Sequence, residues 1–174
     1  MKSLQTIQKT AKVFKTLSMI AMVVSFLWAA TSLVGLVCAV LWEAQGILGF
    51  GRVAMYAVRA ETLNTAIAAL LSDAIFVATD GVLFLMAWRY FKSELADGTP
   101  FTQTGGVKIR RLGISTIVIP NVAVIVSAVV YSVYAVEPMP DWSTGASTLL
   151  GVVLILASLV FRYGAELEEI HHTS

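Results

Sequence analysis

The chain has 174 residues, of which 57% are apolar and 13% are charged, and its mean hydropathy is +0.81. Soluble domains are about half apolar and about a quarter charged, so this composition excludes an ordinary soluble domain and indicates an integral membrane protein. The net charge of +1, with basic residues gathered at the ends of apolar runs, excludes direct nucleic-acid binding as a predicted function.

The N-terminal segment, residues 1–16, has two interpretations. Leu4, Ile7, Ala11 and Phe14 fall on one helical face while lysines occupy other positions, which is typical of an amphipathic helix lying along the inner headgroups. An ordinary basic flank of the first membrane span is the other interpretation, and it is the preferred one.

The first predicted span covers residues 17–42, an uncharged run longer than the roughly 20 residues that a helix needs to cross the hydrocarbon core. It is too long for the apolar region of a signal peptide, about 7 to 15 residues, and no small-x-small cleavage site follows it. The run holds the only cysteine, Cys38, so an intrachain disulfide and a cysteine metal cluster are excluded. We therefore expect a retained helix.

The second predicted span, residues 66–88, is long enough to cross but contains Asp73 and Asp80. Glycines break the chain before it, and residues 52–61 are expected to form a short surface helix. After it, residues 97–100 read Asp-Gly-Thr-Pro, which is a strong turn signal. The span thus lies between two loops and carries two carboxyl groups that need an explanation.

The third and fourth predicted spans cover residues 112–136 and 142–162, with only a short proline-containing loop between them. A membrane β-barrel is excluded because its strands would show alternating segments of about ten residues, whereas these apolar runs are continuous. The predicted fold is all-α: a single membrane domain over residues 1–174, built as a bundle of four transmembrane helices.

The basic residues predict the orientation of this bundle. Ten of the twelve precede the first span, lie between the second and third, or close the fourth, whereas only Arg52 and Arg59 fall in a loop on the other side. Cytoplasmic loops carry an excess of Lys and Arg, so both termini are expected to be cytoplasmic. The expected location is a bacterial inner membrane, with the lipid bilayer as the first partner.

Polar residues within the spans are predicted to form two layers. At 1.5 Å per residue, one set lies roughly 12 to 14 Å from the cytoplasmic ends and the other roughly 22 Å from them. Asp73 and Asp80 are seven residues apart, as are Ser25 and Ser32, so these two helix faces are expected to look at each other. The first layer is Ser25, Asp80 and Asn121, and the second is Ser32, Asp73, Ser127 and Ser147.

Two roles stay open for these layers. A carboxylate near the bilayer centre costs at least about 2.5 to 3.5 kcal/mol, so each aspartate should be paired, hydrogen-bonded, protonated or in contact with water. We expect Asp80 to face the interior within reach of Asn121. The layers are then either structural hydrogen bonds between helices or an ion, proton or ligand site.

Signatures of catalysis are scarce. No histidine lies within a span, and the sequence contains no C-x-x-C, G-x-S-x-G, H-E-x-x-H or phosphate-loop motif. The sequence therefore predicts a protein that is not an enzyme, with no cofactor and no metal.

Two motifs suggest a family. Residues 96–101 (ADGTPF) leading to residues 110–113 (RRLG), together with residues 160–167 (VFRYGAEL), resemble the bacterial membrane family catalogued as domain of unknown function 2975. The tail that follows, residues 168–172, departs from the family's usual polar ending. The resemblance implies an association with small helix-turn-helix regulators. It places a cytoplasmic interaction motif at Asp97, Gly98, Pro100, Phe101, Arg110, Arg111, Arg162 and Glu166.

Two functions follow from these expectations. The first is a non-enzymatic accessory, sensor or regulatory protein that meets a protein partner through its cytoplasmic face. The alternative is a small proton- or ion-coupled transporter that uses Asp73 and Asp80. A second copy of the chain is a further candidate partner. For Arg162 we expect a position at the membrane surface, with pairing to Glu166 or Glu169.

Overall fold

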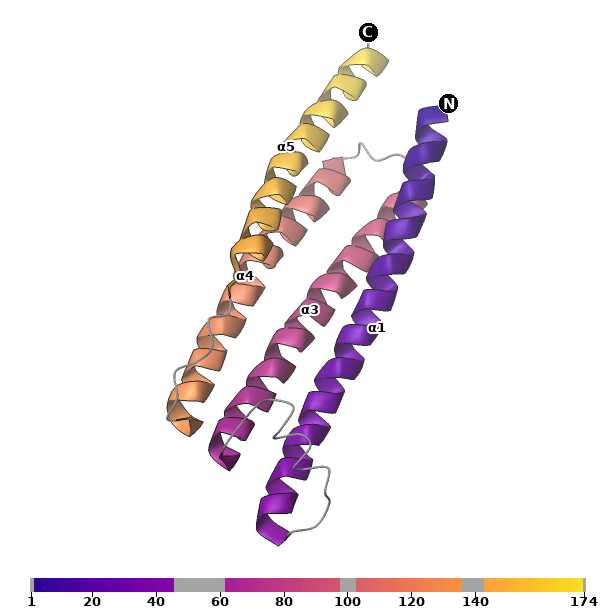
Figure 1. The fold of residues 1–174 in the computed structure, drawn as a ribbon. Coiled ribbons are helices and arrows are strands. Elements are labelled where there is room, and N and C mark those ends of the chain that lie inside the picture. The colour runs from indigo at the N-terminus through magenta and orange to yellow at the C-terminus, as the bar shows by residue number, and fades with distance from the viewer. Residues whose placement is uncertain (1, 46–61, 98–102, 136–142, 174) are drawn as a thin grey trace. The chain divides into compact units, whose positions relative to one another are not determined.

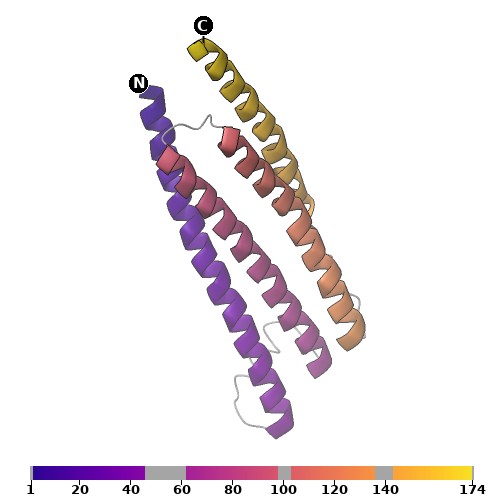
Figure 2. The ribbon, with the colours of Figure 1, turned by 180° about the vertical axis from the view of Figure 1, so that it is seen from behind.

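The computed structural model describes residues 2–45, 62–97, 103–135 and 143–173, and these ranges are almost entirely helical. The helices are α1 (Lys2–Gln45), α3 (Leu63–Asp97), α4 (Gln103–Tyr134) and α5 (Gly145–Thr173), shown from two sides in Figures 1 and 2. Each is long and apolar enough to cross a membrane, over Gln8–Leu41, Leu63–Ala96, Thr104–Tyr134 and Gly145–Gly164. The predicted all-α class with four membrane-length helices is confirmed.

The helices are longer than the predicted spans because helix ends follow capping and loops, whereas the spans were set by hydropathy alone. α3 begins beside Thr62, whose Oγ1 accepts a hydrogen bond from the backbone N–H of Thr65 at 3.2 Å. α1 continues without a break through residues 2–16 of the basic segment. Outside the described residues lie the surface helix expected at 52–61, residues 98–100 of the turn expected at 97–100, and the loop 137–141.

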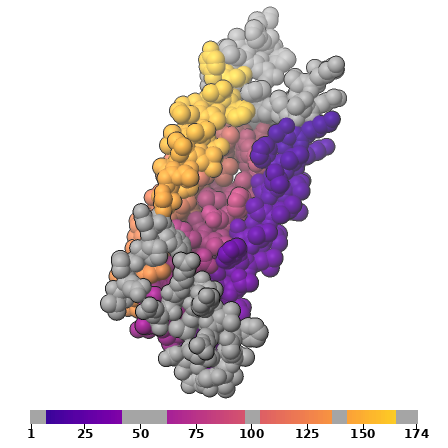
Figure 3. Space-filling view, viewed as in Figure 1, coloured from indigo at the N-terminus to yellow at the C-terminus, as the bar shows by residue number. Residues whose placement is uncertain are grey.

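The surface of the described helices is strongly apolar. Large side chains such as Leu27, Ile125 and Leu149 are 62 to 67% exposed, and the helices α1 and α5 contribute to the face seen in Figure 3. The residues with no exposure are small: Ala39, Ala66, Ala68, Ser72, Ser127 and Ser158. Small residues let helix backbones approach closely where lipid surrounds the bundle, so this distribution is typical of a membrane protein.

The chain forms two compact units, each built from pieces of several helices. Unit 1 comprises Met1–Met22, Val82–Ile119 and Thr144–Ser174, and unit 2 comprises Val23–Gly81 and Pro120–Ser143. Ten of the twelve basic and five of the eleven acidic residues of the sequence belong to unit 1, which therefore has a formal charge of +5. Unit 2 holds the other two basic and six acidic residues, a formal charge of −4.

Within unit 1, α4 and α5 meet through glycines. A Cβ atom added to Gly113 would lie 2.8 Å from the carbonyl oxygen of Gly151, and one added to Gly151 would lie 2.7 Å from the carbonyl oxygen of Gly113. Two turns away, a Cβ on Gly106 would lie 3.4 Å from the carbonyl oxygen of the fully buried Ser158. No side chain larger than hydrogen fits at Gly113 or Gly151 without moving backbone.

The N-terminal part of α1 also packs within unit 1. The ring of Phe14 stacks on that of Phe91 in α3, with centroids 5.6 Å apart and an angle of 18° between the ring planes. Tyr90 meets Phe91 edge to face at 5.3 Å. Phe14 was one of the apolar residues expected to lie on the headgroups, and its contact with α3 means that this face serves, at least there, in helix packing.

Candidate functional site

The carboxyl group of Asp73 in unit 2 receives hydrogen bonds from α1. The Oγ of Ser32 donates to Asp73 Oδ2 at 2.5 Å, and the indole Nε1 of Trp28 donates to the same oxygen at 3.2 Å. The structure thus brings together Ser32 and Asp73 from the second predicted layer. It adds Trp28, which lies one helical turn before Ser32 and so on the same face of α1.

The other members of that layer are not joined to Asp73. Ser127 is fully buried in α4, and its hydroxyl has no hydrogen-bond partner among the residues that the structure describes. Ser147 belongs to unit 1, where its Oγ donates to the carbonyl oxygen of Thr144 at 2.8 Å. Trp28, Ser32 and Asp73 therefore form a local site.

The expectation that Asp80 faces the interior is wrong. Asp80 is exposed, and it forms no hydrogen bond with any of the residues described, whereas Ser25 and Asn121 are half-buried. The cause lies beside it: the ring of Phe26 on α1 packs against Gly81, where an added Cβ would meet Phe26 Cζ at 3.0 Å. At about 100° per residue, Asp80 lies about 100° around the helix from this contact.

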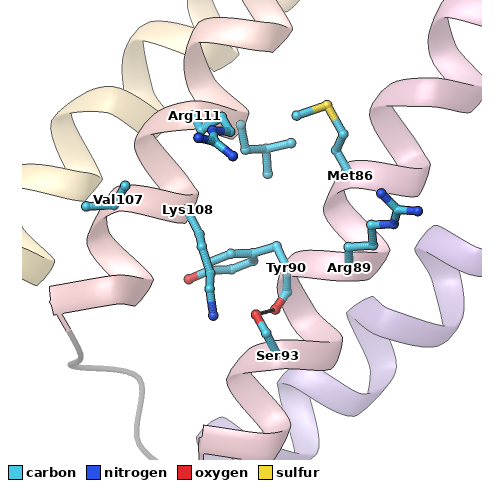
Figure 4. A pocket seen from close by; sticks show the side chains of 8 residues that line it. Met86, Arg89, Tyr90, Ser93, Val107, Lys108 and Arg111 are labelled. Atoms are coloured by element: carbon cyan, nitrogen blue, oxygen red, sulfur yellow. Dashed lines mark hydrogen bonds between the residues drawn. The ribbon is translucent and has the colours of Figure 1, made fainter.

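A second candidate site is a pocket between α3 and α4 in unit 1, which we call the arginine pocket (Figure 4). Its volume is about 380 Å³. Arg89 comes from α3, and Lys108 and Arg111 come from α4, so three cations line it. The other lining residues are Met86, Tyr90, Ser93, Val107 and Leu112, which means that no carboxylate is among them.

A third candidate site, which we call the α4–α5 pocket, lies beside the arginine pocket in unit 1. Its volume is about 580 Å³, and it is lined by Thr104, Val107, Lys108 and Arg162. It shares Val107 and Lys108 with the arginine pocket. A Cβ on Gly106 would lie 2.8 Å from Cγ of Arg162, so the stem of Arg162 runs against the glycine backbone of α4.

The predicted cytoplasmic motif is brought together in part. Arg110, Arg111 and Arg162 are all exposed in unit 1. Gly98, Pro100 and Phe101 lie outside the described residues, as do the side chains of Asp97, which ends α3, and Glu166, which is in α5. The expected pairing of Arg162 with Glu166 or Glu169 falls there too.

Sequence reasoning missed Arg89 and Lys108 as site residues. Both were counted only as basic flanks that set orientation, and their convergence depends on the packing of α3 against α4. A usable signal was present: Lys108 and Arg111 are three residues apart, which puts them on one helical face.

In the part of the chain that the structure describes, no three His, Cys, Asp or Glu side chains lie close enough to hold a metal ion together. Comparison of the chain with protein-family models, curated proteins and solved structures finds no match. Function is therefore inferred from the chemistry of the Asp73 contact and of the two basic pockets.

Proposed function

We propose that this chain is a multi-pass protein of a bacterial inner membrane, with unit 1 and both termini on the cytoplasmic side. The support is the charge difference between the units, +5 against −4, carried by a chain with four membrane-length helices. Lys and Arg are retained on the cytoplasmic side during insertion.

Cysteine labelling tests this orientation. In a Cys38→Ser background, we expect Ser143→Cys, in the residues just before α5, to react with a membrane-impermeant maleimide in intact spheroplasts. Thr104→Cys, at the basic start of α4, should react only after the membrane is opened. The cysteine-free parent is the control for background labelling. Labelling of Thr104→Cys in intact spheroplasts would reverse the assignment.

We further propose that the protein is a non-enzymatic accessory or regulatory protein that holds an acidic segment of a cytoplasmic protein at the α4–α5 pocket. One observation carries this: Arg162 of the second motif packs on Gly106, which lies more than 50 residues earlier, between the two parts of the first motif. Lys108 and Arg162 both line the hollow there, which suits carboxylate groups. Following the proposed family, the partner class is a small helix-turn-helix regulator.

Charge reversal tests the partner site. In affinity capture from native membranes, Arg162→Glu should release the soluble partner, because a carboxylate then faces an acidic segment. Lys92→Glu is the matched control, since the ammonium of Lys92 lies 5.1 Å from the Trp88 ring centroid and lines neither pocket. A Glu→Arg change in the partner should restore binding to Arg162→Glu. A partner retained equally by all variants would contradict the site.

The transporter alternative has weaker support. Of its two carboxyl groups, Asp73 is engaged by two donors from α1, and Asp80 lies on the surface of unit 2. A proton-coupled site needs a carboxyl group that exchanges with water or cargo, whereas two hydrogen bonds from a packed helix favour a structural role for Asp73.

A further inference from the structure

We propose that the arginine pocket binds the phosphate of an anionic phospholipid headgroup. The inference rests on the membrane location proposed above and does not depend on the protein partner. The pocket differs from the α4–α5 pocket in its walls, because it combines cations with a long apolar border.

The charges of the pocket select an anion. Arg89 approaches from α3 and Arg111 from α4, and neither forms an ion pair or hydrogen bond with another described residue. Among the residues that the structure describes, no Asp or Glu lines the hollow. An arginine guanidinium presents a planar fork of N–H donors that matches two phosphate oxygens, so two arginines on facing helices suit a phosphate better than a single carboxylate.

The neutral groups of the pocket fit the same ligand. Tyr90 lines the pocket (Figure 4), and its phenolic hydroxyl is a donor for a phosphate oxygen. The hydroxyl of Ser93 instead donates to the carbonyl oxygen of Tyr90 at 2.8 Å, so it is already used. The volume of about 380 Å³ lies within the roughly 300 to 1,000 Å³ range typical of small-molecule pockets.

The apolar walls favour a lipid over a free phosphate. Met86 and Leu112 line the hollow and belong to candidate membrane spans, Leu63–Ala96 and Thr104–Tyr134. A soluble phosphate leaves these walls uncovered, whereas the acyl chains of a phospholipid cover them while its phosphate meets the arginines. Basic pockets between transmembrane helices on the cytoplasmic side are known to take anionic headgroups.

Lipid binding by the purified protein, measured by native mass spectrometry with phosphatidylglycerol and phosphatidylcholine, tests the proposal. We expect phosphatidylglycerol to bind at least about tenfold more tightly, and the Arg89→Gln/Arg111→Gln variant to lose that preference, since each charged hydrogen bond is worth about tenfold. Arg110→Gln is the matched control: Arg110 is exposed and adjacent in sequence, but it does not line the pocket. It should keep the preference.

Further measurements distinguish a lipid from a soluble phosphate as the ligand, and the arginine pocket from other binding sites. The Arg89→Lys/Arg111→Lys variant keeps both charges, so it should fold and retain only part of the preference, because the forked geometry is lost. Glycerol 3-phosphate is the soluble probe, and competition at the affinity of the lipid would overturn the lipid as ligand. A preference for phosphatidylglycerol that survives in the glutamine variant would overturn the pocket. A partner that Arg162→Glu still retains, with lipid binding intact, would contradict only the proposed function.

Discussion

Replacing Gly151 by leucine is expected to lower the free energy of unfolding by about 3 kcal/mol or more, the upper end of overpacking effects. The first atom of any side chain at this position would lie 2.7 Å from the carbonyl oxygen of Gly113. Because that neighbour is backbone, no change of rotamer relieves the contact, and α4 and α5 must separate. Denaturant titration of the purified protein in detergent micelles measures the loss.

Val152→Leu is the matched control for this substitution. Val152 is the next residue of α5 and is 43% exposed, so the same leucine there enlarges only the outer surface. Gly151→Ala should show a smaller loss than Gly151→Leu, because alanine gains about 1 kcal/mol of helix propensity while adding one carbon. Equal stability of Gly151→Leu and Val152→Leu would show that the glycine contact does not hold α4 and α5 together.

Replacing Asp73 by leucine is expected to move two measurements in opposite directions. Membrane insertion of the segment 63–97 should improve by at least about 2.5 kcal/mol, because a carboxyl group leaves the bilayer centre. The stability of the folded protein should fall by about 1 to 3 kcal/mol, because the bonds from Ser32 and Trp28 are lost. Glycosylation mapping reports the insertion, and denaturant titration in micelles reports the stability.

Asp80→Leu separates the two effects. Asp80 is exposed and has no hydrogen bond among the described residues, so its replacement should improve insertion without lowering folded stability. Asp73→Asn keeps an oxygen that accepts both bonds, and it should stay close to the parent in stability. If Asp80→Leu destabilised the protein as much as Asp73→Leu, this result would contradict the exposed position of Asp80.

The four helices could be predicted because crossing a hydrocarbon core requires long apolar runs, and such runs are visible in any sequence. Depth along straight helices could be predicted as well, since 1.5 Å per residue is fixed by helix geometry. The calculation predicted that Ser32 and Asp73 lie at the same depth in the membrane. The structure places them in hydrogen-bond contact.

The direction in which a side chain points around the helix axis could not be predicted in the same way. Asp73 and Asp80 share a face by spacing, yet the contact of α3 with α1 passes from Asp73 to Gly81, where Phe26 packs. This shift of the contact depends on the packing of the Phe26 ring against Gly81, which residue spacing does not reveal. Trp28 was missed because tryptophan was considered only as an interfacial anchor, although its indole N–H is a donor that a carboxylate within a span can use.

The arginine pocket could not be predicted from the sequence either, because residues from two different helices form it. Arg111 stood in a predicted motif, but Arg89 lies more than twenty residues earlier, and only the packing of α3 against α4 brings them to one hollow. The contact between Gly113 and Gly151 likewise could not be predicted from the sequence. Hydropathy determines which segments cross the membrane, whereas the contacts between particular residues depend on how the side chains of neighbouring helices pack.

The length of α1 has a mechanical consequence. Its 44 residues span about 66 Å at 1.5 Å per residue, roughly twice the thickness of a hydrocarbon core of about 30 Å. A continuous helix of this length acts as a stiff lever. A change of 10° in its tilt, as thinning of the bilayer produces, swings a point about 20 Å beyond the core sideways by about 3.5 Å. In a helix of this length, a small change of tilt therefore moves an end by several ångströms.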